Sequence, residues 1–317
     1  MSDTPLPAAH GPVAGDTPAE HARPPASVAE NPYLRIWNEL RESPSAILGL
    51  IVFTTMVLLA VFASWITPQN PYDLMEVDII NSMYPPMTRA DGMLYLMGSD
   101  EQGRDVFSAI LYGLRTSLLV GFASTAFSLV LGLIVGLCAA YYGGWLDALL
   151  MRLVDLQLGI PTILIALILL ALFGRGVDKV IIALIVVQWA YYARTVRAAA
   201  MVERRKEYVD AAVCQGLSGF QIGYIHLLRN CLPPVIVVAT MQIAHAISLE
   251  ATLSFLGVGV PITEPSLGLL ISNGFNFMLS GDYWISFFPG LVLFVTVLSV
   301  NFVGDRLRDI LNPRLKK

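Results

Sequence analysis

Six long apolar runs constrain this chain more than any other feature. A helix needs about 20 predominantly apolar residues to cross the hydrocarbon core of a bilayer. Only 14% of the residues are charged, whereas about 25% is typical of soluble domains. A transmembrane barrel would instead show short strands of alternating polarity. We therefore predict an all-α integral membrane protein, whose spans fall at about residues 46–66, 116–142, 156–173, 177–199, 231–257 and 283–304.

The first 31 residues have a different composition. They contain six prolines together with many alanines and polar residues, and they offer too little apolar surface to order themselves. They also lack the basic segment and apolar core of a signal peptide. We predict a disordered tail at residues 1–31 and one transmembrane domain at residues 32–317.

The distribution of basic residues predicts the orientation. Six spans put both termini on the same side of the membrane. If that side is the cytoplasm, 15 of the 20 lysines and arginines lie in cytoplasmic segments. Cytoplasmic loops carry an excess of these residues. We therefore expect cytoplasmic N- and C-termini and a cytoplasmic loop at residues 203–229, between the fourth and fifth spans.

This loop contains the polar stretch "EYVDAAVCQGLSGFQIGYIHLLRNCLPP", residues 207–234. Residues 207–215 read as a short helix with acidic residues in its first turn, which the helix dipole favours. Gly216 follows at the expected helix end, where a left-handed backbone favours glycine. Residues 218–228 predict a second short helix before the next span. Ala211 and Ala212 are small enough to let another surface approach closely. The alternative is an ordinary solvated loop.

Two ionisable residues, His245 and Glu250, lie within the fifth apolar run. Ionisable groups inside a membrane are costly and commonly functional. These two side chains could line a route for a zwitterionic substrate. The alternative is that Glu250 lies near the outer end of a long helix and forms a hydrogen bond with a neighbour.

No residue pattern predicts catalysis or metal binding. None of the four lysines follows a glycine, as a Walker A motif would require. The three cysteines have no spacing typical of a zinc site or a disulfide framework. The net charge of −4 argues against a nucleic-acid partner. We therefore expect no catalytic residues, no metal ligands and no cofactor in this chain.

Two shorter patterns predict local structure. Gly132 and Gly136 form a small-xxx-small pair, which lets two membrane helices approach closely. The sequence Gly103-Arg104-Asp105 could end an external helix, with an ion pair that holds the turn, and an ordinary surface turn is the alternative.

The 203–229 loop resembles the EAA loop of permease subunits of ABC importers. That motif has Glu-Ala-Ala, then three residues and a glycine, with Ile-x-Leu-Pro further on. Asp210, Ala211, Ala212 and Gly216 occupy the corresponding positions here, although Asp210 replaces the usual glutamate and Arg229 replaces the later proline. The resemblance implies that these four residues belong to coupling helices that seat in a groove of an ATPase subunit.

Further stretches are similar to dipeptide/oligopeptide-type permeases, and most of all to their C-type subunit. The stretches are "MGSDEQGRDVFSAILYGLRTSLLVG", "YYGGWLDALLMRLVDLQLGIP", "LSFLGVGV" and "PGLVLFVTVLSVNFVGDRLRDILNPRL", which begin at residues 97, 141, 253 and 289. The resemblance implies six transmembrane helices of the type I ABC importer permease kind, with cytoplasmic coupling helices, in a bacterial inner membrane.

The same resemblance implies the partners. They are a second permease subunit, two ATP-binding subunits that carry ATP and Mg, an extracytoplasmic solute-binding protein, and membrane lipid. The outer segment at residues 68–107 has seven acidic and two basic residues, so we expect it to help dock the binding protein.

Two alternatives stay open. Nickel, opine and glutathione permeases share these motifs, so the substrate need not be a peptide. A stand-alone secondary transporter or channel would need coupling-ion sites, typically from intramembrane carboxylates or broken helices in matching halves. Glu250 is the one carboxylate that we find for such a role, and no clear internal repeat is seen.

Overall fold

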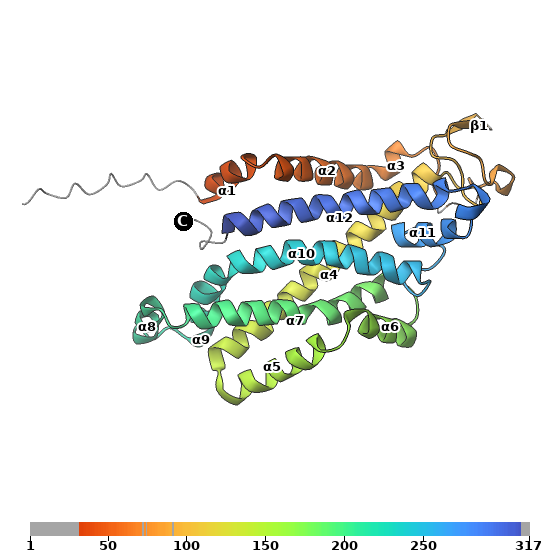
Figure 1. Ribbon diagram of the computed structural model, residues 1–317. Coiled ribbons are helices and arrows are strands. Elements are labelled where there is room, and N and C mark those ends of the chain that lie inside the picture. The colour runs from red at the N-terminus through yellow and green to blue at the C-terminus, as the bar shows by residue number, and fades with distance from the viewer. Residues whose placement is uncertain (1–31, 72, 74, 91, 312–317) are drawn as a thin grey trace, which may run out of the picture.

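The computed structural model describes residues 32–71, 73, 75–90 and 92–311, which form a bundle of long helices (Figure 1). The predicted tail at residues 1–31 lies outside the described residues. The elements are α1 (Pro32–Arg41), α2 (Pro44–Val61), α3 (Ala63–Ile66), η1 (Ile79–Asn81), β1 (Thr88–Ala90), β2 (Met93–Tyr95), α4 (Val106–Tyr142), α5 (Gly144–Leu158), α6 (Thr162–Phe173), α7 (Val177–Glu203), α8 (Glu207–Cys214), α9 (Gly219–Gln221), η2 (Ile222–Leu228), α10 (Arg229–Phe255), α11 (Leu267–Phe275), η3 (Met278–Ser280) and α12 (Trp284–Leu311).

Five helical segments within the described residues are long and apolar enough to cross a membrane. They are α2, α4, α7, the continuous segment Gly219–Phe255, and α12. A sixth crossing is possible if the bent pair α5 and α6 counts as one span. Figure 1 shows that this pair carries the chain from the end of α4 to the start of α7 at the opposite end of the bundle.

The predicted third span at 156–173 is not one straight helix. α5 and α6 meet at an angle of 89°. Pro161 has no N–H to donate and disfavours helical backbone at Ile160, so the helix breaks there. At a rise of 1.5 Å per residue, α5 and α6 are about 22 Å and 18 Å long, and neither alone spans about 30 Å of hydrocarbon.

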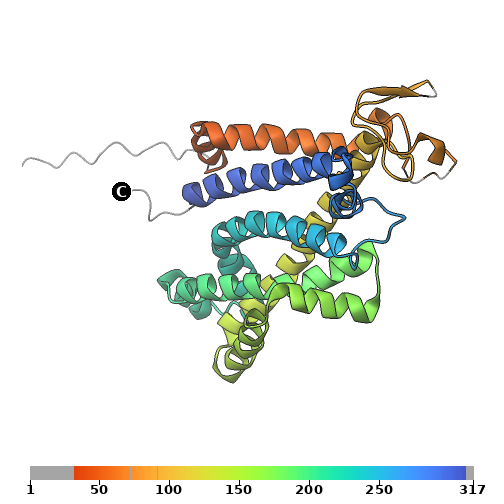
Figure 2. The same cartoon turned by 45° about the vertical axis from the view of Figure 1, so that its right-hand side comes forward.

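The bundle has two distinct ends. The described ends of the chain lie at the same end as α8, which we call the α8 end (Figures 1 and 2). The antiparallel β1–β2 hairpin, α3 and α11 lie at the opposite end, which we call the hairpin end. An even number of crossings accounts for this arrangement.

The predicted second span begins ten residues too late. α4 starts at Val106, because the carboxylate of Asp105 accepts a hydrogen bond from the Ser108 N–H at 2.8 Å and caps the helix. The Gly103-Arg104-Asp105 sequence therefore begins a helix and does not end one. Arg104 forms its ion pair with Asp100, at 2.7 Å, and not with Asp105.

The fifth crossing also starts earlier than predicted. A capping box formed by Ser218 and Gln221 begins the helical segment at Gly219. The segment then runs through a π-helical stretch, η2, into α10 without a break. Pro233 and Pro234, expected at its start, lie inside the helix.

α4 packs closely against α7, as the two glycines predict. A Cβ atom on Gly132 would collide with the Cβ of Tyr192 and lie 2.9 Å from the Ala193 nitrogen. A Cβ on Gly136 would lie 2.7 Å from the Ala193 oxygen. Only glycine fits at these positions, so α4 and α7 form a firmly packed pair.

Two ion pairs fix α5 against α7. Arg197 Nη2 donates to Asp147 Oδ2 at 2.6 Å, and Arg194 pairs with Asp155. Both arginines lie in the second half of α7, and both acids lie on α5. α7 is therefore held to α4 by close packing and to α5 by ion pairs.

Candidate functional site

The α8 segment projects from one end of the bundle and is anchored by a small core of its own (Figure 1). Val209 and Ala212 of α8 pack with Ile222 and Leu227 of η2. Tyr141 at the end of α4 also packs against this cluster. α8 is therefore a fixed projection, supported by α4 and by the beginning of the fifth crossing.

Gly216 ends α8 in a left-handed turn, as predicted, with φ at +79°. Its N–H donates to the Val213 carbonyl at 2.9 Å, and the Leu217 N–H donates to the Ala212 carbonyl at 3.2 Å. This pair of bonds is the Schellman arrangement that closes many helices. A Cβ on Gly216 would meet no atom within 4 Å, so the backbone conformation is what demands glycine here.

The Asp210-Ala211-Ala212 triplet divides between two faces of α8. Ala212 is buried in the small core, whereas Asp210 and Ala211 are exposed. Val213, which is 57% exposed, extends the outward face. Of the two alanines expected to admit another surface, only Ala211 is free to do so, because Ala212 holds α8 to its own chain.

The predicted second short helix is not a separate unit. Residues 219–228 form the first turns of the long segment that continues into α10. The η2 part of it is π-helical, a local form that is frequent at functional sites. Phe220 and Tyr224 stack in parallel on its exposed side, with ring centroids 6.3 Å apart.

A hydrogen-bond chain joins the ends of three elements beside α8. The Tyr208 hydroxyl donates to Glu203 Oε2 at 2.7 Å and accepts from Asn230 Nδ2 at 3.0 Å. Burial and the Glu203 carboxylate raise the pKa of Tyr208 above its ordinary value, so the phenol keeps its proton as donor. This chain holds α7, α8 and α10 in fixed relation.

The two ionisable residues of the fifth apolar run are not brought together. Glu250 is fully buried, and its carboxylate accepts hydrogen bonds from Ser117 of α4 at 2.7 Å and from Ser254 at 2.8 Å. His245 is exposed on α10. Five residues turn an α-helix by about 140°, so the two side chains face different directions. The surroundings of Glu250 match the alternative given for it in the sequence analysis, a hydrogen bond with a neighbouring residue.

A buried polar cluster in the middle of the bundle was not foreseen. Gln188 of α7 and Gln242 of α10 are both buried, and Gln188 Nε2 donates to the Gln242 carbonyl at 3.4 Å. The side-chain atoms Gln188 Oε1 and Gln242 Nε2 have no protein partner. Two glutamines inside otherwise apolar runs were the signal that sequence reasoning could have used.

The described part of the chain contains no group of three or more His, Cys, Asp or Glu residues placed to hold a metal ion. The three cysteines lie in different surroundings. Cys214 is exposed on α8, Cys138 is half-buried on α4, and Cys231 is buried at the start of α10.

Comparison with known sequences identifies two matching regions. Residues 128–317 match the family described as the binding-protein-dependent transport system inner membrane component. Residues 31–86 match the N-terminal transmembrane domain of oligopeptide transport permease C. Together the two regions cover most of the described residues.

Relatives match over nearly the whole length. The dipeptide transport system permease protein DppC of Escherichia coli K12 is 38% identical over 293 residues, which are 92% of this chain and 96% of the relative. DppC of Haemophilus influenzae is 35% identical over 91% of this chain and 97% of its own. A putative peptide transport system permease protein of Brucella suis is 38% identical over 91% of this chain and 94% of its own.

A solved structure confirms the fold. A chain of the MetNI methionine ABC transporter, in an inward-facing conformation, superposes with a TM-score of 0.53 at 22% identity. The match covers 64% of this chain and 96% of that chain. The predicted permease fold is therefore present. Taken with the sequence matches, these findings show that the chain belongs to the family of binding-protein-dependent transport system inner membrane components, the membrane-spanning permease subunits of ABC importers.

Proposed function

We propose that this chain is the C-type permease subunit of an ABC importer for dipeptides or short oligopeptides. The observation that carries the proposal is the end-to-end match to relatives named dipeptide or peptide transport permeases. Nickel, opine and glutathione-like substrates are the alternatives within the same kind of machine. In each case the chain contributes half of the translocation pathway.

The proposed coupling element is α8 with its closing turn, which contains Asp210, Ala211, Ala212 and Gly216. The proposal is supported by the way in which α8 is connected to the rest of the bundle. The exposed face at Asp210 and Ala211 is available to an ATP-binding subunit, while Ala212 joins α8 to η2. A push on α8 would therefore reach the fifth crossing directly. Closure of the ATP-binding subunits would bias the bundle between inward- and outward-facing states.

His245 and Glu250 are the proposed residues of the translocation pathway. Geometry favours His245 for direct contact, because it is the exposed member of the pair. Glu250 would act from inside, by fixing α10 against Ser117 of α4. A transporter needs contacts that are weak enough to release its substrate.

The proposed assembly has a second permease subunit, two ATP-binding subunits that hold ATP and Mg, and an extracytoplasmic solute-binding protein. The α8 end and both termini would face the cytoplasm of a bacterium, and the hairpin end would meet the binding protein. The basic residues concentrated at the α8 end support this orientation.

Purification of the tagged chain, expressed with its neighbouring genes, tests this function. We expect ATP-binding subunits to co-purify, and we expect a dipeptide-loaded binding protein to stimulate ATP hydrolysis in vesicles. Purification without an ATP-binding subunit would instead indicate a stand-alone carrier. Stimulation only by a nickel-loaded binding protein would refute the peptide assignment and keep the importer class.

A further inference from the structure

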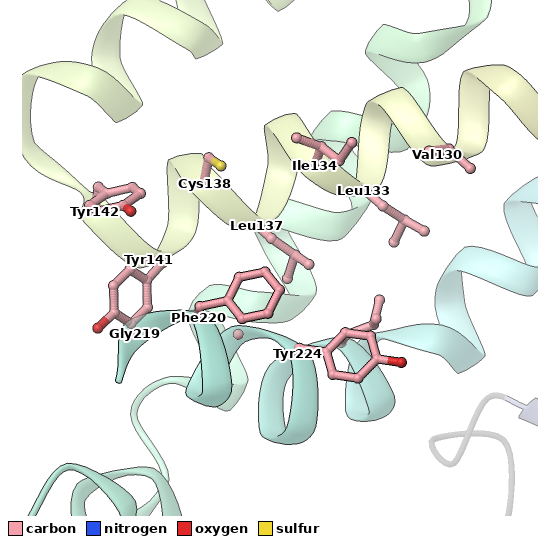
Figure 3. Close-up of a pocket in the computed structure, with 12 residues that line it drawn as sticks. Val130, Leu133, Ile134, Leu137, Cys138, Tyr141, Tyr142, Gly219, Phe220 and Tyr224 are labelled. Carbon is pink, nitrogen blue, oxygen red and sulfur yellow. The ribbon is translucent and has the colours of Figure 1, made fainter. Parts of the chain in front are cut away.

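An apolar groove lies between the second half of α4 and the segment formed by α9 and η2 (Figure 3). Its volume is about 360 Å³. Leu133, Leu137 and Tyr141 line it from α4, and Phe220, Gly223 and Tyr224 line it from the facing helix. Phe220 is 83% exposed and Tyr224 is 64% exposed, so the groove is open on one side.

The length of the groove matches half a bilayer. Its lining on α4 runs from Val130 to Tyr142, and the 12 helical steps between these residues correspond to about 18 Å. The hydrocarbon core is about 30 Å thick, so one leaflet contributes about 15 Å. Tyr141 and Tyr142 lie at the α8 end of the groove, where aromatic side chains are typical of the membrane–water boundary.

Positive charge gathers at the same end. Arg204 and Arg205 are exposed, and with Asp210 they line a second cavity of about 430 Å³. Arg204 Nη1 donates to the Ala140 carbonyl at 2.7 Å, and its guanidinium lies 5.6 Å from the centre of the Tyr141 ring. Two guanidinium groups and one carboxylate leave a net positive charge beside the groove. Arginine binds phosphate oxygens well, and basic pockets between membrane helices bind anionic headgroups.

We propose that the groove holds one acyl chain of an anionic phospholipid from the leaflet at the α8 end, with the lipid phosphate on Arg204 and Arg205. The groove wall formed by α9 and η2 follows α8 directly in the chain. A bound acyl chain therefore braces the proposed coupling element against α4. The proposal does not depend on which substrate the importer carries.

Gly223→Leu tests the groove. A Cβ on Gly223 would meet no atom within 4 Å, so the leucine fills the groove without a collision, and it favours the helix more than glycine does. Gly290→Leu is the matched control, because Gly290 lies in α12 with equally open space. Native mass spectrometry of the assembled importer, extracted from membranes rich in phosphatidylglycerol, measures retained lipid. We expect retention to fall about tenfold in Gly223→Leu, since displacing two methylene groups has about that effect.

Arg204→Gln combined with Arg205→Gln tests the headgroup. The control is Arg229→Gln, at an exposed basic residue that lines neither cavity. In nanodiscs, the double variant should lose its preference for phosphatidylglycerol over phosphatidylcholine, and the control should keep it. A phosphatidylglycerol with a photoreactive group in its acyl chain should label residues 130–142 of the unmodified protein.

Three results would overturn the proposal. One is equal lipid retention by Gly223→Leu and Gly290→Leu. Another is equal binding of phosphatidylcholine and phosphatidylglycerol by the unmodified protein. The third is a cross-link from Cys138, which lines the groove, to the second permease subunit, because that would make the groove an interface between proteins.

Discussion

Gly216 lets the chain turn at the end of α8 without backbone strain, because glycine tolerates its left-handed conformation. Its surroundings are open, so the backbone conformation alone restricts the residue type. A residue with a side chain costs about 1–2 kcal/mol in this conformation, and a β-branched one costs more. We expect Gly216→Val to reach the membrane at normal levels and to lose nearly all transport, because the turn that aims α8 is altered. Uptake and binding-protein-stimulated ATP hydrolysis in vesicles measure this. Asp210→Ala, at an exposed side chain, should be milder.

Gly257→Val is the matched control for this prediction. Gly257 has φ of +75° and open space, and it closes α10 with the same pair of backbone hydrogen bonds that closes α8 at Gly216, but it lies away from α8. Gly257→Val carries the same backbone strain and should transport better than Gly216→Val. Equal loss in the two variants would show general destabilisation. Wild-type uptake and wild-type ATP hydrolysis for Gly216→Val would show that the α8 turn only connects two segments and has no role in coupling.

Asp105 provides a prediction about pH. Burial raises the pKa of its carboxyl group above the ordinary value. The folded chain therefore holds the proton more tightly than the unfolded chain, and this residue lowers stability as pH rises from the ordinary pKa through the folded one. Asp105→Asn still offers an oxygen to Ser108 but carries no charge. Its Tm relative to the wild type should rise as the pH increases above about 4, the ordinary pKa of an aspartate.

Asp78→Asn serves as the control for this comparison. Asp78 also caps a helical turn at the hairpin end, where it accepts the Ile80 N–H at 2.9 Å, but it is exposed. Its Tm is measured over the same pH range and reports the effect of removing a capping charge at an exposed site. A difference for Asp105→Asn that stays flat, or that becomes more negative with rising pH, would contradict the prediction.

At single residues, the sequence predicts local backbone conformation but not long-range contacts. The left-handed turn at Gly216 follows from residue type and position alone. The split between Ala211 and Ala212 depends on where Ile222 and Leu227 lie, which no local pattern contains. Likewise, Glu250 is recognisable in sequence as an intramembrane acid, but its bond to Ser117 joins residues 133 positions apart.

At the scale of elements, the packing of α4 on α7 is sensitive to added side-chain volume at its two glycines. We expect Gly132→Ala to lower the stability of the importer by about 1–3 kcal/mol, because the added methyl group forces α4 away from Tyr192 and Ala193. Membrane abundance and Tm in detergent measure the effect. Gly290→Ala, at an open position within α12, should lower neither, because alanine favours a helix more than glycine does. Equal membrane abundance and equal Tm of the two variants would mean that α7 moves away from the added methyl group at little cost in free energy.

Hydropathy located the helices well and their ends poorly. The apolar runs predict α2, α4, α7 and α12, because length and composition alone decide whether a segment suits the bilayer. The early start of α4 depends on the cap at Asp105, and the early start of the fifth crossing depends on the box at Ser218. Pro161 was visible within the third run, but the 89° bend that follows from it was not expected.

At the scale of the whole molecule, orientation is open to direct test. Cys214 is exposed on α8, and Leu279 is fully exposed in η3, which follows α11 of the hairpin end. One variant keeps Cys214 as its only cysteine, and the other carries Leu279→Cys without native cysteines. A membrane-impermeant maleimide should label position 279 in intact cells, and Cys214 only after the membrane is opened. The opposite pattern would reverse the proposed orientation.

The acidic outer segment makes a prediction about assembly. Asp73, Glu76 and Asp78 accept backbone N–H groups of nearby turns, and amides keep those bonds while removing the charge. Changing the three to Asn, Gln and Asn should slow association with the binding protein at low salt, because exposed charge acts mainly on encounter rates. High salt should remove the difference. Association rates that match the wild type at low salt would leave this segment an ordinary solvated loop.

The buried carboxylate of Glu250 is a point at which three helices are joined. Its hydrogen bonds tie α10 to Ser117 of α4, and the side chain of Ser266, which caps α11, also interacts with it. Three helices thus share one fixed point toward the hairpin end. From Ser117 to Tyr142, α4 extends about 38 Å. A tilt of one degree about that point would therefore displace the α8 end of α4 by about 0.7 Å, and Tyr141 near that end packs against the cluster that anchors α8.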